Sequence, residues 1–310
     1  MQLSKPKIGL ALGSGSARGW SHIGVIRVLE EAGITPDIVC GTSIGSLVGA
    51  AYVDGQLEPL EKWVRSLTWQ SVMGLLDFTL TGGLIHGEKL FTYLRSHFSE
   101  RDIASLPKVY GAVATELISG REVWLREGPV IDAVRASAAL PGLFKPVEMD
   151  GRLLVDGALV NPVPVSLCRA MGADIVIAVD LNSDLIGRHF DLGRASENSD
   201  AQATPTALST MLDKLPLKLG RLKNGADASN GPASSLPLPS IFDVLSISLN
   251  IMQVRITRSR LAGEPADILI RPRLANLALM DYHRAAQAIE EGEHAAQHVL
   301  PELKEMLGLD

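Results

Sequence analysis

Ile38-Val39-Cys40-Gly41-Thr42-Ser43-Ile44-Gly45 is the stretch that decides the fold of this 310-residue chain. A short apolar run ends in a glycine-framed serine, and an apolar segment continues to about Tyr52. This order predicts a buried strand, a tight turn and a helix, and Gly-x-Ser-x-Gly is typical of a nucleophile elbow. Gly41 and Gly45 are expected because bulky neighbours would clash in this turn. The helix would place its positive N-terminal end beneath the Ser43 hydroxyl.

A second glycine-framed segment, Gly13-Ser14-Gly15-Ser16-Ala17-Arg18-Gly19, follows the apolar run Ile8–Leu12. Backbone N–H groups in such a loop can stabilise an oxyanion. The candidate donors are the N–H groups of Gly13, Ser14, Gly15, Ser16 and Ala17. The competing interpretation is a dinucleotide fingerprint, which requires an acidic residue at the end of the second strand. Here that strand ends in Cys40-Gly41-Thr42-Ser43 and has Asp37 at its other end, so the nucleotide interpretation is disfavoured.

The residues alone leave the base that activates Ser43 open. Asp156-Gly157-Ala158 follows the apolar run 153–155, so the Asp156 carboxylate can enter a cleft and act as general base. The alternative is a simple Asp-Gly turn. A Ser-His-Asp triad would instead need a histidine, and His283 is the best candidate by chain order. His22 is expected to be structural, His86 is ambiguous, and no strand-end setting favours His97, His189, His294 or His298.

Four segments together resemble the sequence blocks of the patatin-like phospholipases, most closely the small bacterial RssA-type group. They are the two glycine-framed segments, Ala136-Ser137-Ala138-Ala139-Leu140-Pro141 and Asp156-Gly157-Ala158, within about residues 7–181. The resemblance implies a three-layer α/β/α hydrolase fold with a mostly parallel central sheet. It also implies a Ser43–Asp156 dyad without a catalytic histidine, the loop 13–19 as oxyanion hole, and hydrolysis of lipid acyl esters. Ser14 is a departure, since many members carry glycine there; backbone donors should tolerate it.

Five further residues are expected to support this site. Arg18 would provide a nearby charge, and the others would shape the turns: Gly41, Gly45, Gly157 and Pro141. The block 136–144 is otherwise interpreted as scaffold, in which small residues let a helix end pack closely.

Apolar runs and amphipathic segments alternate along the first 180 residues, which predicts a mostly parallel sheet covered by helices. The predicted strands are residues 8–12, 38–40, 108–115, 122–125, 153–155 and 175–179. The predicted helices are residues 17–32, 44–52, 58–67, 88–98 and 130–137. Residues 1–181 are thus the predicted catalytic core. Periodicity weakens in 182–240, which predicts a mobile loop or lid, and 241–310 should complete the same domain as helix, strand (266–270) and helix (282–307).

The composition and net charge of the chain disfavour several classes of function. A net charge of −6 disfavours a general nucleic-acid role. Two cysteines, Cys40 and Cys168, form neither a disulfide framework nor a metal-ligand spacing. The serine acyl-transfer mechanism implies no metal or organic cofactor. The first apolar run has five residues, too short for a signal peptide, and we expect a cytoplasmic protein.

The expected partner is a lipid or acyl-ester substrate. An arginine cluster with three apolar neighbours suggests peripheral contact with an anionic membrane at its inner face, the alternative being a core helix with solvated arginines. The cluster comprises Arg255, Arg258, Arg260, Arg271 and Arg273, with Leu249, Met252 and Ile256. A regulatory adaptor on a hydrolase scaffold, with a protein partner or a second copy, is the alternative function. A small-ester esterase or thioesterase would share the mechanism.

Overall fold

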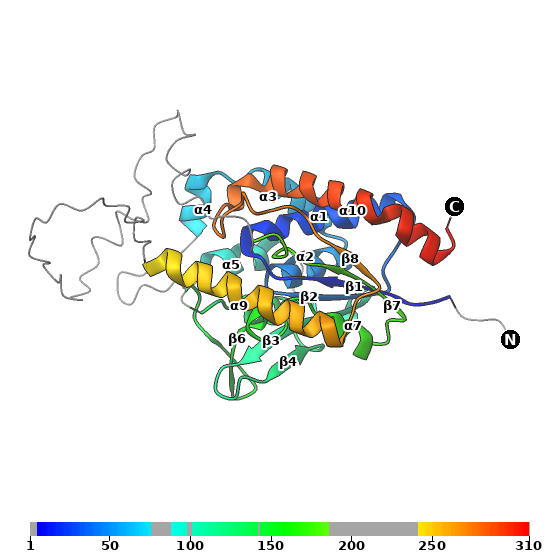
Figure 1. Cartoon of the computed structure of the whole chain (residues 1–310). Helices are drawn as coiled ribbons and strands as arrows, with labels where there is room; N and C mark the ends of the chain where they lie inside the picture. The colour runs from blue at the N-terminus through cyan, green and yellow to red at the C-terminus, as the bar shows by residue number, and fades with distance from the viewer. Residues whose placement is uncertain (1–4, 76–87, 98–100, 142, 186–240, 310) are drawn as a thin grey trace, which may run out of the picture. The chain divides into compact units, whose positions relative to one another are not determined.

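The computed structural model describes residues 5–75, 88–97, 101–141, 143–185 and 241–309 (Figure 1). The chain divides into two units, one comprising residues 1–187 with 246–310 and the other residues 188–245. Only residues 241–245 of the second unit are described, so the architecture is that of the first. Most of the segment 182–240, the predicted loop or lid, lies outside the described residues.

An eight-stranded sheet forms the centre of the described part, in the order β5-β6-β3-β2-β1-β7-β8, with β4 paired to β3. Strands β1, β2, β3, β7 and β8 are parallel, whereas β4 and β6 run antiparallel to β3, and β5 antiparallel to β6. The prediction of a mostly parallel sheet is confirmed. The strands are Ile8–Leu12 (β1), Ile38–Thr42 (β2), Val109–Glu116 (β3), Glu122–Leu125 (β4), Val147–Met149 (β5), Arg152–Asp156 (β6), Ile175–Val179 (β7) and Ile268–Ile270 (β8).

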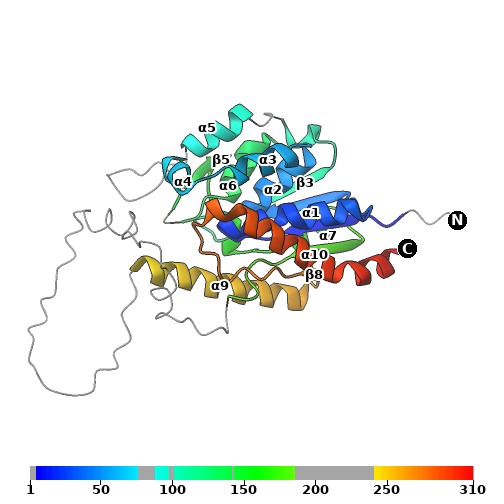
Figure 2. The same ribbon diagram turned by 90° about the horizontal axis from the view of Figure 1, so that it is seen from above.

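Helices cover both faces of the sheet, which confirms the predicted three-layer α/β/α architecture (Figures 1 and 2). Helices α1, α2, α6 and α10 pack over Leu10, Leu12 and Val39 on one face. Helix α7 packs over Cys40 and Val113 on the other face, where α9 adds a partly buried leucine. The helices are Ser21–Glu31 (α1), Ile44–Val53 (α2), Leu57–Arg65 (α3), Trp69–Leu75 (α4), Glu88–His97 (α5), Val130–Ser137 (α6), Val165–Ala170 (α7), Ile241–Gly263 (α9) and Ala285–Leu307 (α10).

Strands β2 and β6 meet end to end along the same edge of β3. Val113 pairs with Thr42, the last residue of β2, and the next residue, Ala114, pairs with Asp156, the last residue of β6. Both Val113 and Ala114 also pair with β4, which therefore occupies the opposite edge of β3. Because β2 and β6 run in opposite directions, their carboxyl ends face one another at this point, and the residue after Thr42 is Ser43.

Some elements differ from the sequence-based expectations. The predicted helix 17–32 begins as a 3-10 turn, Ser16–Trp20, before α1, and the helix predicted from residue 282 begins as a second one, Tyr282–Arg284. Helices α4 and α7 and strand β5 were not predicted. The two helices have only seven and six residues, about two turns or fewer, and β5 has three residues with a glutamate in the middle, so none of them shows a clear apolar period.

Candidate active site

Ser43 occupies a strained turn between β2 and α2. Its backbone angles are φ 58° and ψ −123°, and a non-glycine residue keeps a positive φ only where its surroundings enforce it. Glycines make the turn feasible: a Cβ on Gly41 would lie 2.4 Å from the Gly45 carbonyl oxygen, and one on Gly45 would lie 2.2 Å from the Leu12 carbonyl oxygen. The turn leaves Ser43 at the end of the sheet, directly before the first residue of α2.

The structure brings Asp156 to the Ser43 hydroxyl. Ser43 Oγ donates a hydrogen bond to Asp156 Oδ2 at 2.6 Å, and the Ala158 N–H donates to Oδ1 at 2.8 Å. Asp156 is 1% exposed. Burial raises the pKa of Asp156 to about 6, against the opposing effect of the hydrogen bonds from Ser43 and Ala158. A carboxyl group that titrates near the working pH, within reach of a serine, suits general-base chemistry.

The glycine-rich loop, residues 13–19, presents fewer free donors than the sequence predicts. Three of its N–H groups donate to carbonyl oxygens elsewhere: Gly13 to Val179 at 3.1 Å, Ser14 to Pro162 at 2.8 Å and Ala17 to Leu279 at 3.2 Å. The N–H groups of Gly15 and Ser16 have no acceptor in the part of the chain that the structure describes. Ser16 has a φ of 50°, so the loop bends sharply at this residue.

The side chain of Arg18, a residue of the same loop, is buried, with 1% of it exposed. Its guanidinium donates to two amide oxygens, Asn182 Oδ1 at 3.1 Å and Asn250 Oδ1 at 3.2 Å. Burial lowers the pKa of Arg18 to about 10, which leaves it positively charged at neutral pH. The Asn182 amide also donates to the Ser14 carbonyl and to Gln253 Oε1, so a buried polar network joins the loop to α9.

The block 136–141 contacts both Ser43 and Asp156 through residues that the sequence marked only as scaffold. The Ser43 N–H donates to Ser137 Oγ at 2.9 Å, and the Asp156 N–H donates to the Ala139 carbonyl at 3.0 Å. Pro141, by contrast, is exposed and lines neither of the cavities at Ser43. Gly157 packs tightly, because a Cβ there would lie 2.2 Å from the Val113 carbonyl oxygen.

The described histidines do not contact the Ser43 side chain. His22 is fully buried, and its Nε2 lies 2.8 Å from the Gly13 carbonyl oxygen. Burial lowers the pKa of His22 to about 4. The ring of His283, the triad candidate by chain order, packs edge-on against Trp69, whereas Asp156 is the hydrogen-bond partner of Ser43 Oγ. His294 and His298 are exposed, the side chain of His97 is not described, and His86 and His189 lie outside the described residues.

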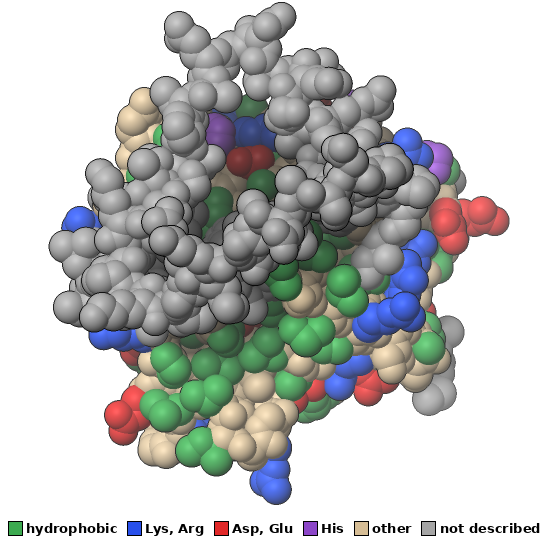
Figure 3. All heavy atoms as spheres, turned by 60° about the vertical axis from the view of Figure 1, so that its left-hand side comes forward, with side chains coloured by type: hydrophobic (Ala, Val, Ile, Leu, Met, Phe, Trp, Pro, Cys, Tyr) green, Lys and Arg blue, Asp and Glu red, His purple; other side chains and the backbone are tan. Residues whose placement is uncertain are grey.

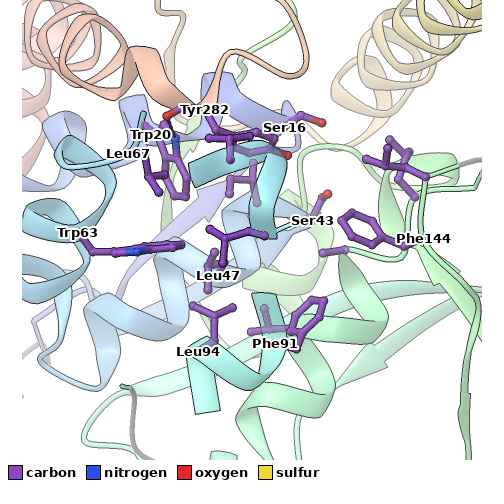
Figure 4. Close-up of a pocket in the computed structure, with 17 residues that line it drawn as sticks. Ser16, Trp20, Ser43, Leu47, Trp63, Leu67, Phe91, Leu94, Phe144 and Tyr282 are labelled. Atoms are coloured by element: carbon purple, nitrogen blue, oxygen red, sulfur yellow. Dashed lines mark hydrogen bonds between the residues drawn. The ribbon is translucent and has the colours of Figure 1, made fainter. Parts of the chain in front are cut away.

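Two cavities meet at Ser43. The larger one, with about 800 Å³ of empty space, is almost entirely apolar, and Figure 4 shows Ser43 and Trp63 on opposite sides of it with Leu47 between them. Its other walls include Leu67, Phe91, Leu94, Phe144 and Tyr282. The smaller one, about 290 Å³, is more polar and lies against the loop; its lining includes Ser14, Gly15, Ser16, Asp156, Asn250 and Gln253. The two cavities thus offer an apolar space and a more polar space on different sides of Ser43.

The described residues contain neither a candidate metal site nor a disulfide. No group of three or more His, Cys, Asp or Glu side chains among the described residues is arranged to hold a metal ion. Cys40 and Cys168 are free thiols, both fully buried in the core between the sheet and α7.

The chain is similar to proteins of one family. The family model described as patatin-like phospholipase matches residues 10–169. An uncharacterized NTE family protein of Mycobacterium tuberculosis is 34% identical over 331 aligned residues, which cover 96% of this chain and 92% of that protein. Human patatin-like phospholipase domain-containing protein 6 is 38% identical over 185 residues, 57% of this chain and 13% of that protein.

The fold likeness extends to a solved structure. The crystal structure of VipD from Legionella pneumophila matches with a TM-score of 0.54 and 15% identity, covering 96% of this chain and 67% of that one. At this identity the match bears on the fold alone. The residues matched by the family model include the serine turn and the segment that carries Asp156, and the mycobacterial relative aligns with 96% of the chain. The chain therefore belongs to the patatin-like phospholipase family of carboxylic ester hydrolases.

Proposed function

We propose that this protein hydrolyses lipid carboxylic esters through a Ser43–Asp156 dyad. The observation that carries the proposal is the 2.6 Å hydrogen bond from Ser43 Oγ to a buried carboxylate, beside an apolar cavity. Ser43 Oγ attacks the ester carbonyl carbon while Asp156 takes the hydroxyl proton. The tetrahedral intermediate then expels the alcohol, which receives that proton. Water then attacks the acyl-enzyme with Asp156 as base. The bond to Ser43 Oγ breaks, Asp156 returns the proton to this oxygen, and the acid leaves.

For the oxyanion we propose two donors, the N–H groups of Gly15 and Ser16. Both residues line the smaller cavity together with Ser43, and their N–H groups are free of acceptors among the described residues. The N–H of Ser43 itself already donates to Ser137. Arg18, positively charged and bonded only to neutral amides through its described hydrogen bonds, adds a favourable potential for the anion.

The larger cavity supports an acyl chain as the group bound there. Apart from Ser16 and Ser43, its walls are aliphatic and aromatic side chains, the kind of lining that predominates in pockets for apolar ligands. Burying each methylene of an acyl chain contributes about 0.8 kcal/mol. We therefore expect medium and long acyl esters to be better substrates than acetate esters.

The sheet edge that carries Ser43 also carries exposed apolar side chains. They gather on the lower half of the face in Figure 3, at the level where Figure 1 places the β3–β4 turn. Ile118 at this turn is 85% exposed, and its neighbours Leu117 and Leu153 are 46% and 39% exposed. Exposed apolar side chains of this kind are expected where a protein receives its substrate from a lipid surface.

For the predicted membrane contact, α9 remains the proposed element, with Met252 as expected and Ile251 as a further apolar residue. Its outward face carries Ile251 and Met252, 45% and 49% exposed, beside the exposed Arg255 and Arg258. Leu249 instead lines the smaller cavity, and Arg260 pairs with Glu122 on β4, so neither is free for lipid. None of the described helices has the length and apolarity needed to cross a membrane.

We propose that the outward face of α9 binds anionic lipid headgroups on the inner side of a membrane, where a cytoplasmic protein can reach them. Co-sedimentation at low salt with vesicles containing anionic lipid, and its loss in the double variant Arg255→Glu/Arg258→Glu, would support the contact. Equal sedimentation of the double variant would refute it.

Intact-mass analysis after fluorophosphonate treatment tests the proposed chemistry. We expect a single adduct on the wild type that maps to Ser43, no adduct on Ser43→Ala, and labelling at least about 100-fold slower on Asp156→Asn. Ser66→Ala, an exposed serine at the end of α3, is the matched control and should label like the wild type. A folded wild type that takes no adduct would contradict the dyad and favour the adaptor.

A further inference from the structure

The end of α6 links the two halves of the proposed dyad. Ser43 directly follows strand β2, and Asp156 is the last residue of strand β6. These two strands meet end to end on β3 and form no ladder with one another. The chain just after α6 spans this junction instead. Ser137 Oγ accepts the Ser43 N–H at 2.9 Å, and two residues later the Ala139 carbonyl accepts the Asp156 N–H at 3.0 Å.

The Ser43 N–H has a particular need for this acceptor. With φ 58° and ψ −123°, Ser43 has left the geometry of β2, and Thr42 is the last residue with a ladder partner on β3. Ser43 is 9% exposed and Ser137 is fully buried, so the N–H has little access to water. A buried N–H without an acceptor is strongly unfavourable, and the strained conformation of Ser43 persists only while its surroundings hold it.

We infer that Ser137 is a positioning residue, whose hydroxyl holds the Ser43 backbone so that Oγ reaches Asp156. This inference rests on the proposed function. Ser137 touches neither cavity at Ser43, so its effect on turnover must pass through the nucleophile. Ala139 holds the other partner in the same way, so residues 137–139 together set the separation of Ser43 and Asp156.

Ser137→Ala tests the inference. It removes the acceptor and leaves the Ala139 carbonyl in place. We expect kcat on a soluble short-chain ester to fall about 10- to 100-fold with KM changed less than about twofold, because small misplacements of a reacting group have effects of this size. Fluorophosphonate labelling of Ser43 should slow by the same factor. Ser137→Thr, which keeps the hydroxyl, should recover most of both rates.

The pH profile separates positioning from a general loss of stability. The Ser43 hydrogen bond lowers the pKa of Asp156, so a looser contact should move the midpoint of kcat/KM upward in Ser137→Ala. Ile131→Val is the matched control: it truncates a buried side chain on the same helix, away from the junction, and should leave kcat and the midpoint unchanged. If Ser137→Ala does not fold, Ser137→Cys, with a weaker acceptor, should give intermediate rates.

The outcomes distinguish this inference from the proposed function. Absence of wild-type labelling would remove the dyad and the inference together. A wild type labelled at Ser43, with Ser137→Ala folded and labelled at the same rate, would refute only the role of Ser137. A drop in stability without a change in kcat or midpoint would do the same, since it would make Ser137 purely structural.

Discussion

Replacing Asp156 with asparagine should stabilise the protein at pH 8 while it removes the proposed base. Burial raises the pKa of this carboxyl from its ordinary value of 3.8 to about 6. The folded protein therefore binds the proton more tightly than the unfolded chain does. The contribution of the carboxyl to stability is full below its unfolded pKa and is lost as the pH rises through the folded pKa.

The size of the effect follows from the pKa interval. The pKa of Asp156 rises from 3.8 in the unfolded chain to about 6 in the folded protein, and each pKa unit corresponds to about 1.4 kcal/mol. At pH 8 the ionised carboxylate therefore destabilises the folded state by about 3 kcal/mol. At pH 5 this destabilisation is only about 1.6 kcal/mol, because the carboxyl group of the folded protein is still mostly protonated. Asparagine stays neutral, and its amide can accept from the Ala158 N–H and donate to Ser43 Oγ, the two contacts that Asp156 makes.

Urea unfolding of the wild type and Asp156→Asn at pH 8 and pH 5, followed by tryptophan fluorescence, measures this difference. The variant should be more stable by about 3 kcal/mol at pH 8 and by roughly half that at pH 5. Asp150→Asn is the control, since that side chain is 79% exposed and its replacement should change stability by less than about 0.5 kcal/mol. Equal stabilities at pH 8, or a difference that does not grow with pH, would refute the reasoning.

Three further predictions address the base, the turn and the acyl cavity. The kcat/KM of the wild type on a soluble ester should rise through about pH 6, because the proposed base must be ionised. The His283→Gln variant should show the same pH profile; loss of the profile in this variant would assign the titrating group to the histidine. Gly45→Ala should destabilise the protein by about 1–3 kcal/mol and slow fluorophosphonate labelling, because its Cβ would lie 2.2 Å from the Leu12 carbonyl oxygen. In urea unfolding, Gly74→Ala on α4, with open space around its Cβ, should show no loss of stability. Leu94→Trp should reduce kcat/KM for decanoate esters about tenfold and leave butyrate esters unaffected, since it fills the cavity away from Ser43; equal losses on both esters would contradict the acyl assignment.

The sequence predicted the elements whose signals are local. The observed bounds of β4, α6 and β7 coincide with the predicted residues 122–125, 130–137 and 175–179, because their apolar patterns are set off by Gly, Pro, Ser or Asp residues. The turn at Ser43 was also predictable, since the glycines that allow it are its neighbours in the chain. The roles of Ser43 and Asp156 stay predictions, although the structure places their side chains within hydrogen-bond distance.

What the sequence could not provide depends on partners distant along the chain. All five predicted oxyanion donors carry an N–H, but those of Gly13, Ser14 and Ala17 donate to carbonyls that lie 148 to 262 residues away in the chain. Ser137 appeared as one small residue in a scaffold block. Its hydroxyl becomes a hydrogen-bond acceptor only when the end of α6 meets the turn at Ser43, 94 residues away in the chain. No local pattern encodes such a contact.

The junction of β2 and β6 on β3 has a consequence for how the protein matures. Ser43 and Asp156 are 113 residues apart, and the register that joins them is made only when the β5–β6 hairpin docks on β3. This docking pairs Asp156 with Ala114, 42 residues earlier in the chain, and such a non-local contact forms slowly compared with helices. During refolding, esterase activity should therefore return after helical circular dichroism has recovered, because the proposed dyad is assembled only when this hairpin docks.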